Sequence, residues 1–120
     1  MLIVTAWNET RSCSLGTMIE VANSPSKRAW GLLGRRQIAE EEGMWIKPSS
    51  GVHTFFMRFA IDVIGLDRHG YVVCVCNNVR PYRIAALRWG VHSVLELQAG
   101  VAKATGTRRG DVLKFQKTRT

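Results

Sequence analysis

The stretch from His53 to Asp67 constrains the fold more than any other part of this chain. It reads His-Thr-Phe-Phe-Met-Arg-Phe-Ala-Ile-Asp-Val-Ile-Gly-Leu-Asp, with three of the four phenylalanines and a carboxylate, Asp62, inside a mostly apolar run. A turn follows, and the chain then returns as Tyr-Val-Val-Cys-Val-Cys over 71–76. Residues 61–76 therefore predict a β-hairpin. Because both faces of its strands are apolar, we expect it to be buried on both sides.

Other short segments with apolar alternation or β-branched residues lie between turn-forming residues. They predict strands over 1–7, 17–22, 44–46, 53–59, 92–98 and 112–115, the first two forming a hairpin with an irregular loop. Ser24 and Pro25 are typical of a helix start, so 25–33 predicts a short helix. Residues 99–105 predict a second helix, closed by Gly106. The succession predicts an α+β fold, mainly β: a small, mostly antiparallel, barrel-like sheet with one or two short helices.

The length of 120 residues predicts a single domain over residues 1–120. No stretch reaches the roughly 18 apolar residues that a membrane span needs, and no signal peptide is seen, so we expect a cytoplasmic protein. Cys13, Cys74 and Cys76 lack the spacing of a disulfide framework and are expected to be free thiols. A second cysteine pair, which structural zinc generally needs, is missing, so we expect no metal; no cofactor motif is found either.

The net charge of +8, from 17 Lys and Arg against 9 Asp and Glu, favours anionic partners. The basic residues are scattered along the chain rather than grouped with aromatic residues. This pattern is more typical of a solvated surface than of a nucleic-acid-binding sheet. Nucleic acid is therefore a possible partner that the sequence does not favour.

The order of motifs along the chain resembles a known family. The matching pieces are Arg28-Ala29-Trp30-Gly31-Leu32-Leu33, Glu42-Gly43-Met44-Trp45-Ile46, His53-Thr54-Phe55-Phe56-Met57-Arg58-Phe59-Ala60-Ile61-Asp62-Val63, Leu66-Asp67, Gly70, Val94-Leu95-Glu96-Leu97-Gln98-Ala99-Gly100 and Gly110-Asp111. Together they resemble the bacterial and archaeal family named domain of unknown function 192, also called uncharacterised protein family 0127, in its His-Thr-Phe-Phe-Met-Arg branch. The resemblance covers about residues 17–115.

The resemblance implies a compact β-rich fold and no established activity. It marks as structural motif positions Met57, Asp67, Glu96, Gly100, Gly110 and Asp111. Ala60 stands where a proline is usual in the family, and Cys74 and Cys76 are not family features. Many relatives carry an export or lipoprotein signal that is not seen here, so an envelope location does not carry over to this chain.

Three polar residues in the central stretch are candidates for a site. Asp62 lies in an apolar run, where its carboxylate must find donors. Structurally, it would accept backbone N–H groups or pair with Arg58; functionally, it would be a general acid or base, or a ligand-binding carboxylate. His53 either bonds a loop carbonyl or contacts a ligand together with Arg58 or Asp62.

These residues favour a ligand- or protein-binding accessory module with a cleft near residues 53–62, formed around His53, Arg58 and Asp62. The first alternative is a small enzyme that uses Asp62 and His53 as an acid–base pair. A histidine and an aspartate without a nucleophile at defined spacing are a weak enzyme signal, so this alternative is less favoured. The second alternative is a nucleic-acid binder. The four tryptophans, Trp7, Trp30, Trp45 and Trp89, are expected mainly to fill the core.

Overall fold

The computed structural model describes residues 2–24, 35, 37–55 and 57–118. The predicted helix over 25–33 lies outside these residues. Among the residues that are described, no helix is long and apolar enough to cross a membrane.

Strands make up about half of the described structure. The elements are β1 (Ile3–Asn8), β2 (Cys13–Ala22), β3 (Glu42–Ile46), β4 (Val52–His53), β5 (Ile61–Leu66), β6 (Val72–Val79), β7 (Ile84–Ala85), β8 (Ser93–Gln98), α2 (Val101–Thr105) and β9 (Leu113–Lys117). One sheet has the order β6-β5-β8-β3-β2-β1-β9, and β4 pairs with β7. Within the large sheet β2 and β3 are parallel, and the other neighbours are antiparallel.

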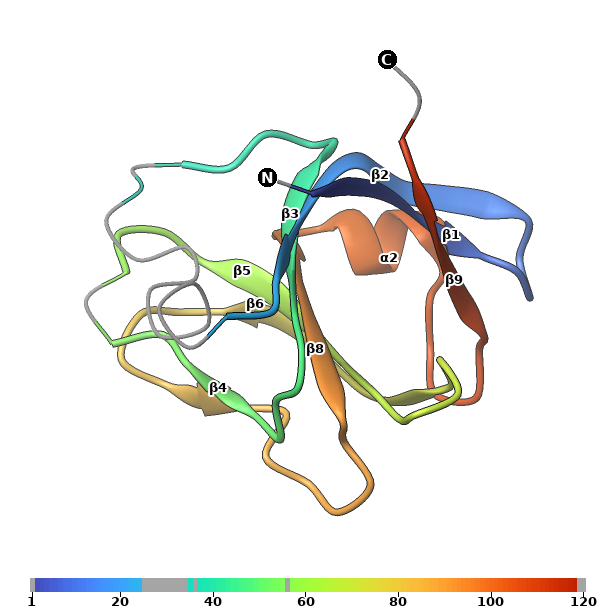
Figure 1. The fold of residues 1–120 in the computed structure, drawn as a ribbon. Helices are drawn as coiled ribbons and strands as arrows, with labels where there is room; N and C mark the ends of the chain where they lie inside the picture. The colour runs from blue at the N-terminus through green and yellow to red at the C-terminus, as the bar shows by residue number, and fades with distance from the viewer. Residues whose placement is uncertain (1, 25–34, 36, 56, 119–120) are drawn as a thin grey trace.

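The large sheet curls into a half-barrel, and α2 lies within the curl (Figure 1). The expected mainly β, barrel-like α+β fold is therefore confirmed. The two edges of the sheet approach each other where Tyr71 bridges Val112. There the Leu113 N–H donates to the Gly70 carbonyl over 2.8 Å. Gly70 has φ of +87°, and a Cβ at this position would lie 2.6 Å from the Leu113 carbonyl oxygen, so only glycine fits the approach of the two edges.

Two hydrophobic clusters pack on the two faces of the strands in the middle of the sheet. The inner cluster fills the curl with side chains such as Ile64 and Leu95, and it includes Val101 of α2. The outer cluster, on the opposite face, contains Val63 and Val94 and packs beneath β4 and β7. Because successive residues of a strand point to opposite faces, all of β5 is buried. The expected burial of the hairpin on both sides is therefore confirmed for β5 and wrong for β6, most of whose residues are partly or fully exposed.

The predicted strand over 53–59 is wrong, because β4 ends at His53 and β5 begins only at Ile61. Thr54 accounts for the break. Its hydroxyl donates to the Arg80 carbonyl (2.6 Å) and accepts the Arg83 N–H (2.9 Å). Its own N–H donates to the Arg83 carbonyl (2.8 Å), so these contacts tie the backbone to the segment before β7 instead of the large sheet.

The first hairpin is longer than predicted, because β2 begins at Cys13 instead of residue 17. Its pairing with β1 shifts register on both sides of Ala6, and such bulges let an irregular sequence remain in a sheet. The hairpin formed by β5 and β6 is confirmed, with β6 extending to Val79. The short helix that ends at Gly106 is also confirmed: Gly106 has φ of +68°.

Candidate binding cleft at the mouth of the half-barrel

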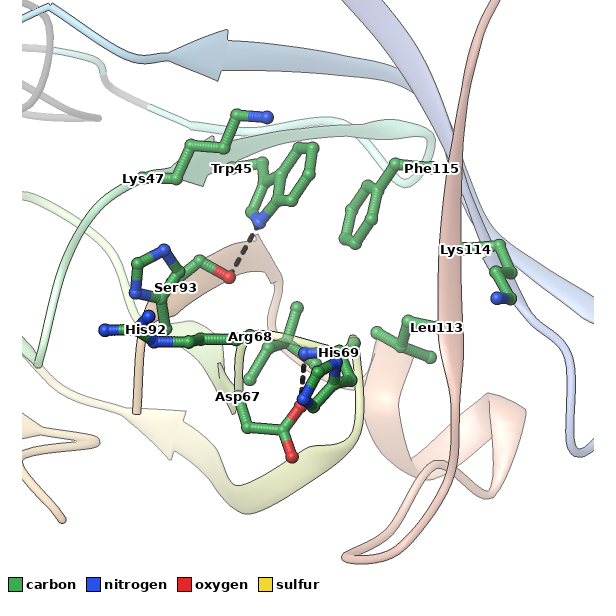
Figure 2. Close-up of a pocket in the computed structure, with 12 residues that line it drawn as sticks. Trp45, Lys47, Asp67, Arg68, His69, His92, Ser93, Leu113, Lys114 and Phe115 are labelled. Carbon is green, nitrogen blue, oxygen red and sulfur yellow. Dashed lines mark hydrogen bonds between the residues drawn. The ribbon is translucent and has the colours of Figure 1, made fainter. Parts of the chain in front are cut away.

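A cleft of about 320 Å³ opens at the end of the half-barrel where β5 ends and β8 begins (Figure 2). Its lining comes from β3, β8, β9 and the turn between β5 and β6, and consists of Trp45, Lys47, Leu66, Asp67, Arg68, His69, Gly70, His92, Ser93, Leu113, Lys114 and Phe115. The other end of β5 contacts α2 through Asp62. The helix and the cleft therefore lie at opposite ends of the same strand.

Trp45 forms the back of this cleft and is held on three sides. Its indole stacks on Phe115 with ring centroids 3.7 Å apart and planes 5° apart. Lys47 Nζ lies 4.0 Å from the Trp45 ring centroid, and since Phe115 covers one face, the ammonium group occupies the other. The indole N–H donates to Ser93 Oγ over 3.0 Å. A ligand would therefore meet the edge of a fixed indole rather than its face.

Ser93 places a buried hydroxyl beside the cleft. Its residue is 3% exposed, and its Oγ accepts the Trp45 N–H. A hydroxyl that accepts one hydrogen bond still has its own proton to donate. Figure 2 shows this hydroxyl between Trp45 and His92. It is the kind of placed polar group that fixes the orientation of a bound molecule.

Positive groups surround the opening. Lys47 and Arg68 line the cleft together with two of the three histidines, His69 and His92, whereas the side chain of Lys114 points to the other face of β9 (Figure 2). The only carboxylate among the lining residues is that of Asp67. Its Oδ1 already accepts the backbone N–H groups of His69 (2.8 Å) and Tyr71 (3.0 Å), which close the turn between β5 and β6. The field in the cleft therefore favours an anion.

The predicted site residues lie elsewhere. Asp62 is completely buried, and its carboxylate accepts the N–H groups of Asn78 (2.9 Å), Gly100 (3.0 Å) and Ala102 (2.9 Å). These contacts are the backbone hydrogen bonds that we expected if the role of Asp62 is structural. The carboxylate of Asp62 fixes the start of α2 and the bend of β6 at Asn78, which has φ of 51°.

His53 and Arg58 are both exposed. The His53 ring lies 5.2 Å from the Phe55 ring, on the outer side of β4. No hydrogen bond or ion pair between described residues joins either His53 or Arg58 to Asp62. The pairing of Asp62 with Arg58 depended on one continuous strand, and the structure interrupts the strand between them. A binding role for these three residues stays a prediction.

Asp111 organises a buried polar network that joins β1 to the turn before β9. Its Oδ2 accepts Arg11 Nε–H (2.7 Å), Asn8 Nδ2–H (3.0 Å) and the Arg108 N–H (3.1 Å). Burial disfavours the ionised carboxyl, but the hydrogen bonds from Arg11, Asn8 and Arg108 outweigh it and hold the pKa of Asp111 below its usual range. Gly110, which the resemblance also marks, precedes it with φ of +93°.

Glu96 has the opposite environment. It is 3% exposed, and its cross-strand neighbours Met44 and Val63 belong to the outer cluster. Its Oε1 has no hydrogen-bond partner among the described residues. Burial raises the pKa of Glu96 to about 7. Of the remaining motif positions, Met57 is buried in the same cluster, and Gly100 has φ of +100° at the start of α2.

The cysteines add no further site. Cys13, Cys74 and Cys76 are free thiols, as expected. Burial, followed by the neighbouring Cys76, raises the pKa of Cys74, which keeps this thiol protonated. Within the described part of the chain, no three His, Cys, Asp or Glu side chains form a group that could hold a metal ion.

Sequence reasoning missed the mouth cleft because its parts are far apart in the chain. Trp45, Ser93 and Phe115 lie on three different strands, and their contacts depend on how the sheet curls. The available signals were His69 and His92, each next to the end of a predicted strand, where binding residues often gather. The sequence alone does not single out either histidine, because it does not show that β5 pairs with β8 and brings the two turns together.

The fold and its cleft define a class of protein: a small, mainly β half-barrel domain with a cationic cleft at its mouth. The chain belongs to the family of domain of unknown function 192, described as uncharacterised ACR, whose model matches residues 6–115. This confirms the resemblance and extends it toward the N-terminus, over β1 and the start of β2.

Relatives and solved structures similar to this chain agree with that assignment. A UPF0127 protein of Pyrococcus abyssi is 31% identical, covering 90% of this chain and 94% of its own. One of Pyrococcus horikoshii is 29% identical, covering 90% and 96%. A crystal structure from Sinorhizobium meliloti, described as a candidate transcription regulator, has a TM-score of 0.80, 28% identity and coverage of 93% and 91%. A protein of unknown function from Novosphingobium aromaticivorans has a TM-score of 0.77, 25% identity and coverage of 92% and 82%.

Proposed function

We propose that this protein is a binding module that takes up a small anionic ligand in the mouth cleft. The observation that carries the proposal is the pair of cations, Lys47 and Arg68, beside the rings of Trp45 and Phe115 and one buried hydroxyl. The volume of about 320 Å³ is at the lower end of the range for small-molecule sites. A compact carboxylate or phosphate with a short apolar part fits this space.

The residues that line the cleft would each contribute to ligand binding in a different way. Lys47 is fixed over the indole, so its remaining N–H donors have little rotational freedom left to lose when an anion binds. Ser93 can donate a directional hydrogen bond from a buried position. The half-buried, stacked rings of Trp45 and Phe115 give the apolar part of a ligand a rigid surface. The ligand's charge would face the exposed Arg68.

The proposal places the binding site away from the cleft that we expected near residues 53–62. Neither His53, Arg58 nor Asp62 lines the mouth cleft. The Asp62 carboxylate already has three backbone donors, so it offers little to a ligand or to acid–base chemistry. His53 and Arg58 are exposed on the surface of the molecule.

Binding of simple anions tests the proposal. We expect inorganic phosphate, acetate and benzoate to raise the melting temperature above that in chloride at equal ionic strength, because a ligand that binds the folded state stabilises it. The double variant K47Q/R68Q should weaken the affinity for these anions by roughly three- to tenfold, the amount expected for two partly exposed ion pairs.

A control variant separates the cleft from general charge effects. K103Q/R109Q removes the same charge from two exposed positions that do not line the cleft, and its anion affinity should match that of the wild type. Equal losses in both double variants would show that the anions respond only to net charge, and the proposal would then be wrong.

A further inference from the structure

We propose that this protein docks onto an anionic lipid bilayer through a face distinct from the mouth cleft. The docking face consists of the outer side of the β4–β7 pair and the connection from β7 to β8. It carries exposed apolar and aromatic side chains: Phe55 (38% exposed), Tyr82 (58%), Ile84 (63%), Leu87 (67%) and Trp89 (99%). A contiguous group of exposed apolar side chains usually marks an interaction surface.

The strand pairing shows that the docking face is one continuous surface. His53 pairs with Ile84, and Val52 pairs with Ala85. Val52 and Ala85 belong to the outer cluster, so the side chains of His53 and Ile84 must point away from it. The Phe55 ring then lies 5.2 Å from the ring of His53 and 6.1 Å from that of Tyr82, which extends the surface beyond the strand ends.

The backbone holds this surface in place. Thr54, which is fully buried, bonds the carbonyl groups of Arg80 and Arg83, and its own carbonyl accepts the Tyr82 N–H over 3.0 Å. Tyr82 has φ of 64°, a left-handed conformation that is unfavourable for a residue with a Cβ atom. Such strain is often found where a residue is held for function. The exposed Tyr82 side chain is therefore presented by a fixed loop.

Leu87 and Trp89 form the outermost part of the docking face. The β7–β8 connection projects from the body of the molecule beside β4 (Figure 1). Leu87 packs its backbone against Gly51, where a Cβ would lie 3.1 Å from Leu87 Cα, and this contact anchors the connection to the segment before β4. The expectation that the tryptophans mainly fill the core is wrong for Trp89, whose side chain is almost entirely in solvent.

The charge of the two segments that build the docking face has one sign. Residues 43–61 and 68–95 contain no Asp or Glu. Arg58, Arg80, Arg83 and Arg88 are exposed within them. Each arginine near an anionic bilayer contributes attraction, while no carboxylate from these segments opposes it.

The kinds of side chain favour a bilayer over other anionic partners. Ile84 and Leu87 are aliphatic and have no ring on which a nucleobase could stack. Trp89 borders a hollow with Ser50, Leu87 and Arg88, but its side chain is 99% exposed, so a partner protein would need a matching pocket to enclose it. Tryptophan and arginine together suit the headgroup region, where the indole sits at the boundary with the acyl chains and the guanidinium group meets phosphate.

Co-sedimentation of the whole protein with vesicles tests the proposal. We expect binding to vesicles of phosphatidylcholine mixed with phosphatidylglycerol, weak binding to phosphatidylcholine alone, and loss of binding in high salt. R83Q/R88Q should lower the partition coefficient by roughly fivefold for each arginine removed. L87S/W89S should lower it at least as much, because its two side chains are the most exposed apolar groups of the face.

Matched controls distinguish the docking face from the rest of the surface. L2S/M18S removes two other exposed apolar side chains (42% and 50% exposed), and R108Q/R109Q removes two other exposed arginines. Both controls, and the cleft variant K47Q/R68Q, should lose less than the docking-face variants. Absence of vesicle binding at low salt, or equal losses in test and control variants, would overturn the proposal. Retention of duplex DNA or an acidic peptide without vesicle binding would also overturn it and identify the other partner.

Discussion

Asp62 and Glu96 are two buried carboxylates of the same sheet that lie in very different environments. Asp62 lies on the inner face of the sheet and accepts three backbone N–H groups. Glu96 lies on the outer face, with one oxygen unpartnered among the described residues. A buried ionised carboxylate is stable only when donors replace the water that it has lost. We therefore expect Asp62 to stabilise the fold and ionised Glu96 to destabilise it.

Asp62→Asn tests the stabilising role. The amide keeps one acceptor oxygen but turns an NH₂ group toward donors that need an acceptor. We expect the free energy of unfolding to fall by about 2 kcal/mol or more, because hydrogen bonds to a charged acceptor are lost inside the protein. Thermal and denaturant unfolding measure this loss. Glu40→Gln, at an exposed position, is the control and should change little. An unchanged stability of Asp62→Asn would contradict the structural role.

Glu96→Gln tests this destabilisation through the pH dependence of the free energy of unfolding. The folded-state pKa of Glu96 is raised from 4.5 to about 7, so the folded protein binds this proton more tightly than the unfolded chain does. The stability that protonated Glu96 contributes is complete below the unfolded-state pKa. It is lost as the pH rises from 4.5 through about 7, by about 3 kcal/mol in all.

The difference in unfolding free energy between the two chains, followed from about pH 5 to about pH 8, measures this effect. The wild type should lose stability over that range relative to Glu96→Gln, which has no proton to release. Parallel pH profiles would show that Glu96 finds a partner or solvent when it ionises, and they would contradict the burial argument.

Among the elements, β3 has the tightest position, because it lies between β2 and β8. A Cβ on Gly43 would lie 2.5 Å from the Glu96 carbonyl oxygen and 2.9 Å from side-chain atoms of Ile19 and Leu97. The backbone of β8 cannot move away without breaking its pairing with β3 and β5. The glycine therefore sets the spacing of three strands.

Gly43→Ala should destabilise the protein by about 2 kcal/mol or more, since the clash is with backbone rather than with the end of a flexible side chain. Gly90→Ala is the matched control. Gly90 has φ of +88°, but a Cβ there would meet nothing within 4 Å, so only the backbone conformation is disfavoured, by about 1 kcal/mol. Chemical denaturation compares the two. A smaller loss at Gly43 than at Gly90 would contradict the packing argument.

At the scale of the elements, the sequence correctly predicted the features that depend on local residue patterns. The β5–β6 hairpin and the helix that ends at Gly106 both depend on neighbouring residues, and both are present. The interruption after His53 depends on bonds from Thr54 to residues 80 and 83, far along the chain. The parallel pairing of β2 with β3 has no local signal either. Such features arise from tertiary contacts that override local preference.

At the scale of the whole molecule, the excess positive charge is not evenly distributed. Lys47 and Arg68 line the mouth cleft, and a separate set of arginines is exposed in the segments that build the docking face. The basic residues are scattered in the sequence, and this pattern predicted a solvated surface. The sequence could not show the grouping, because folding brings together residues that are far apart in the chain. The predicted site was based on Asp62, a carboxylate within an apolar run. Burial alone does not distinguish a functional carboxylate from one that accepts hydrogen bonds from backbone N–H groups.

The most direct test of the anion-binding account is the position of the Trp45 indole N–H signal in a two-dimensional nitrogen–proton NMR spectrum. This N–H donates to Ser93 Oγ at the back of the cleft. On titration with inorganic phosphate or benzoate, its signal should shift and saturate together with the amide signals of His92, Ser93 and Lys114. The signals of Gly106 and Arg109, which do not line the cleft, should stay in place. Saturable shifts confined to residues outside the cleft, with the Trp45 signal unmoved, would contradict the account.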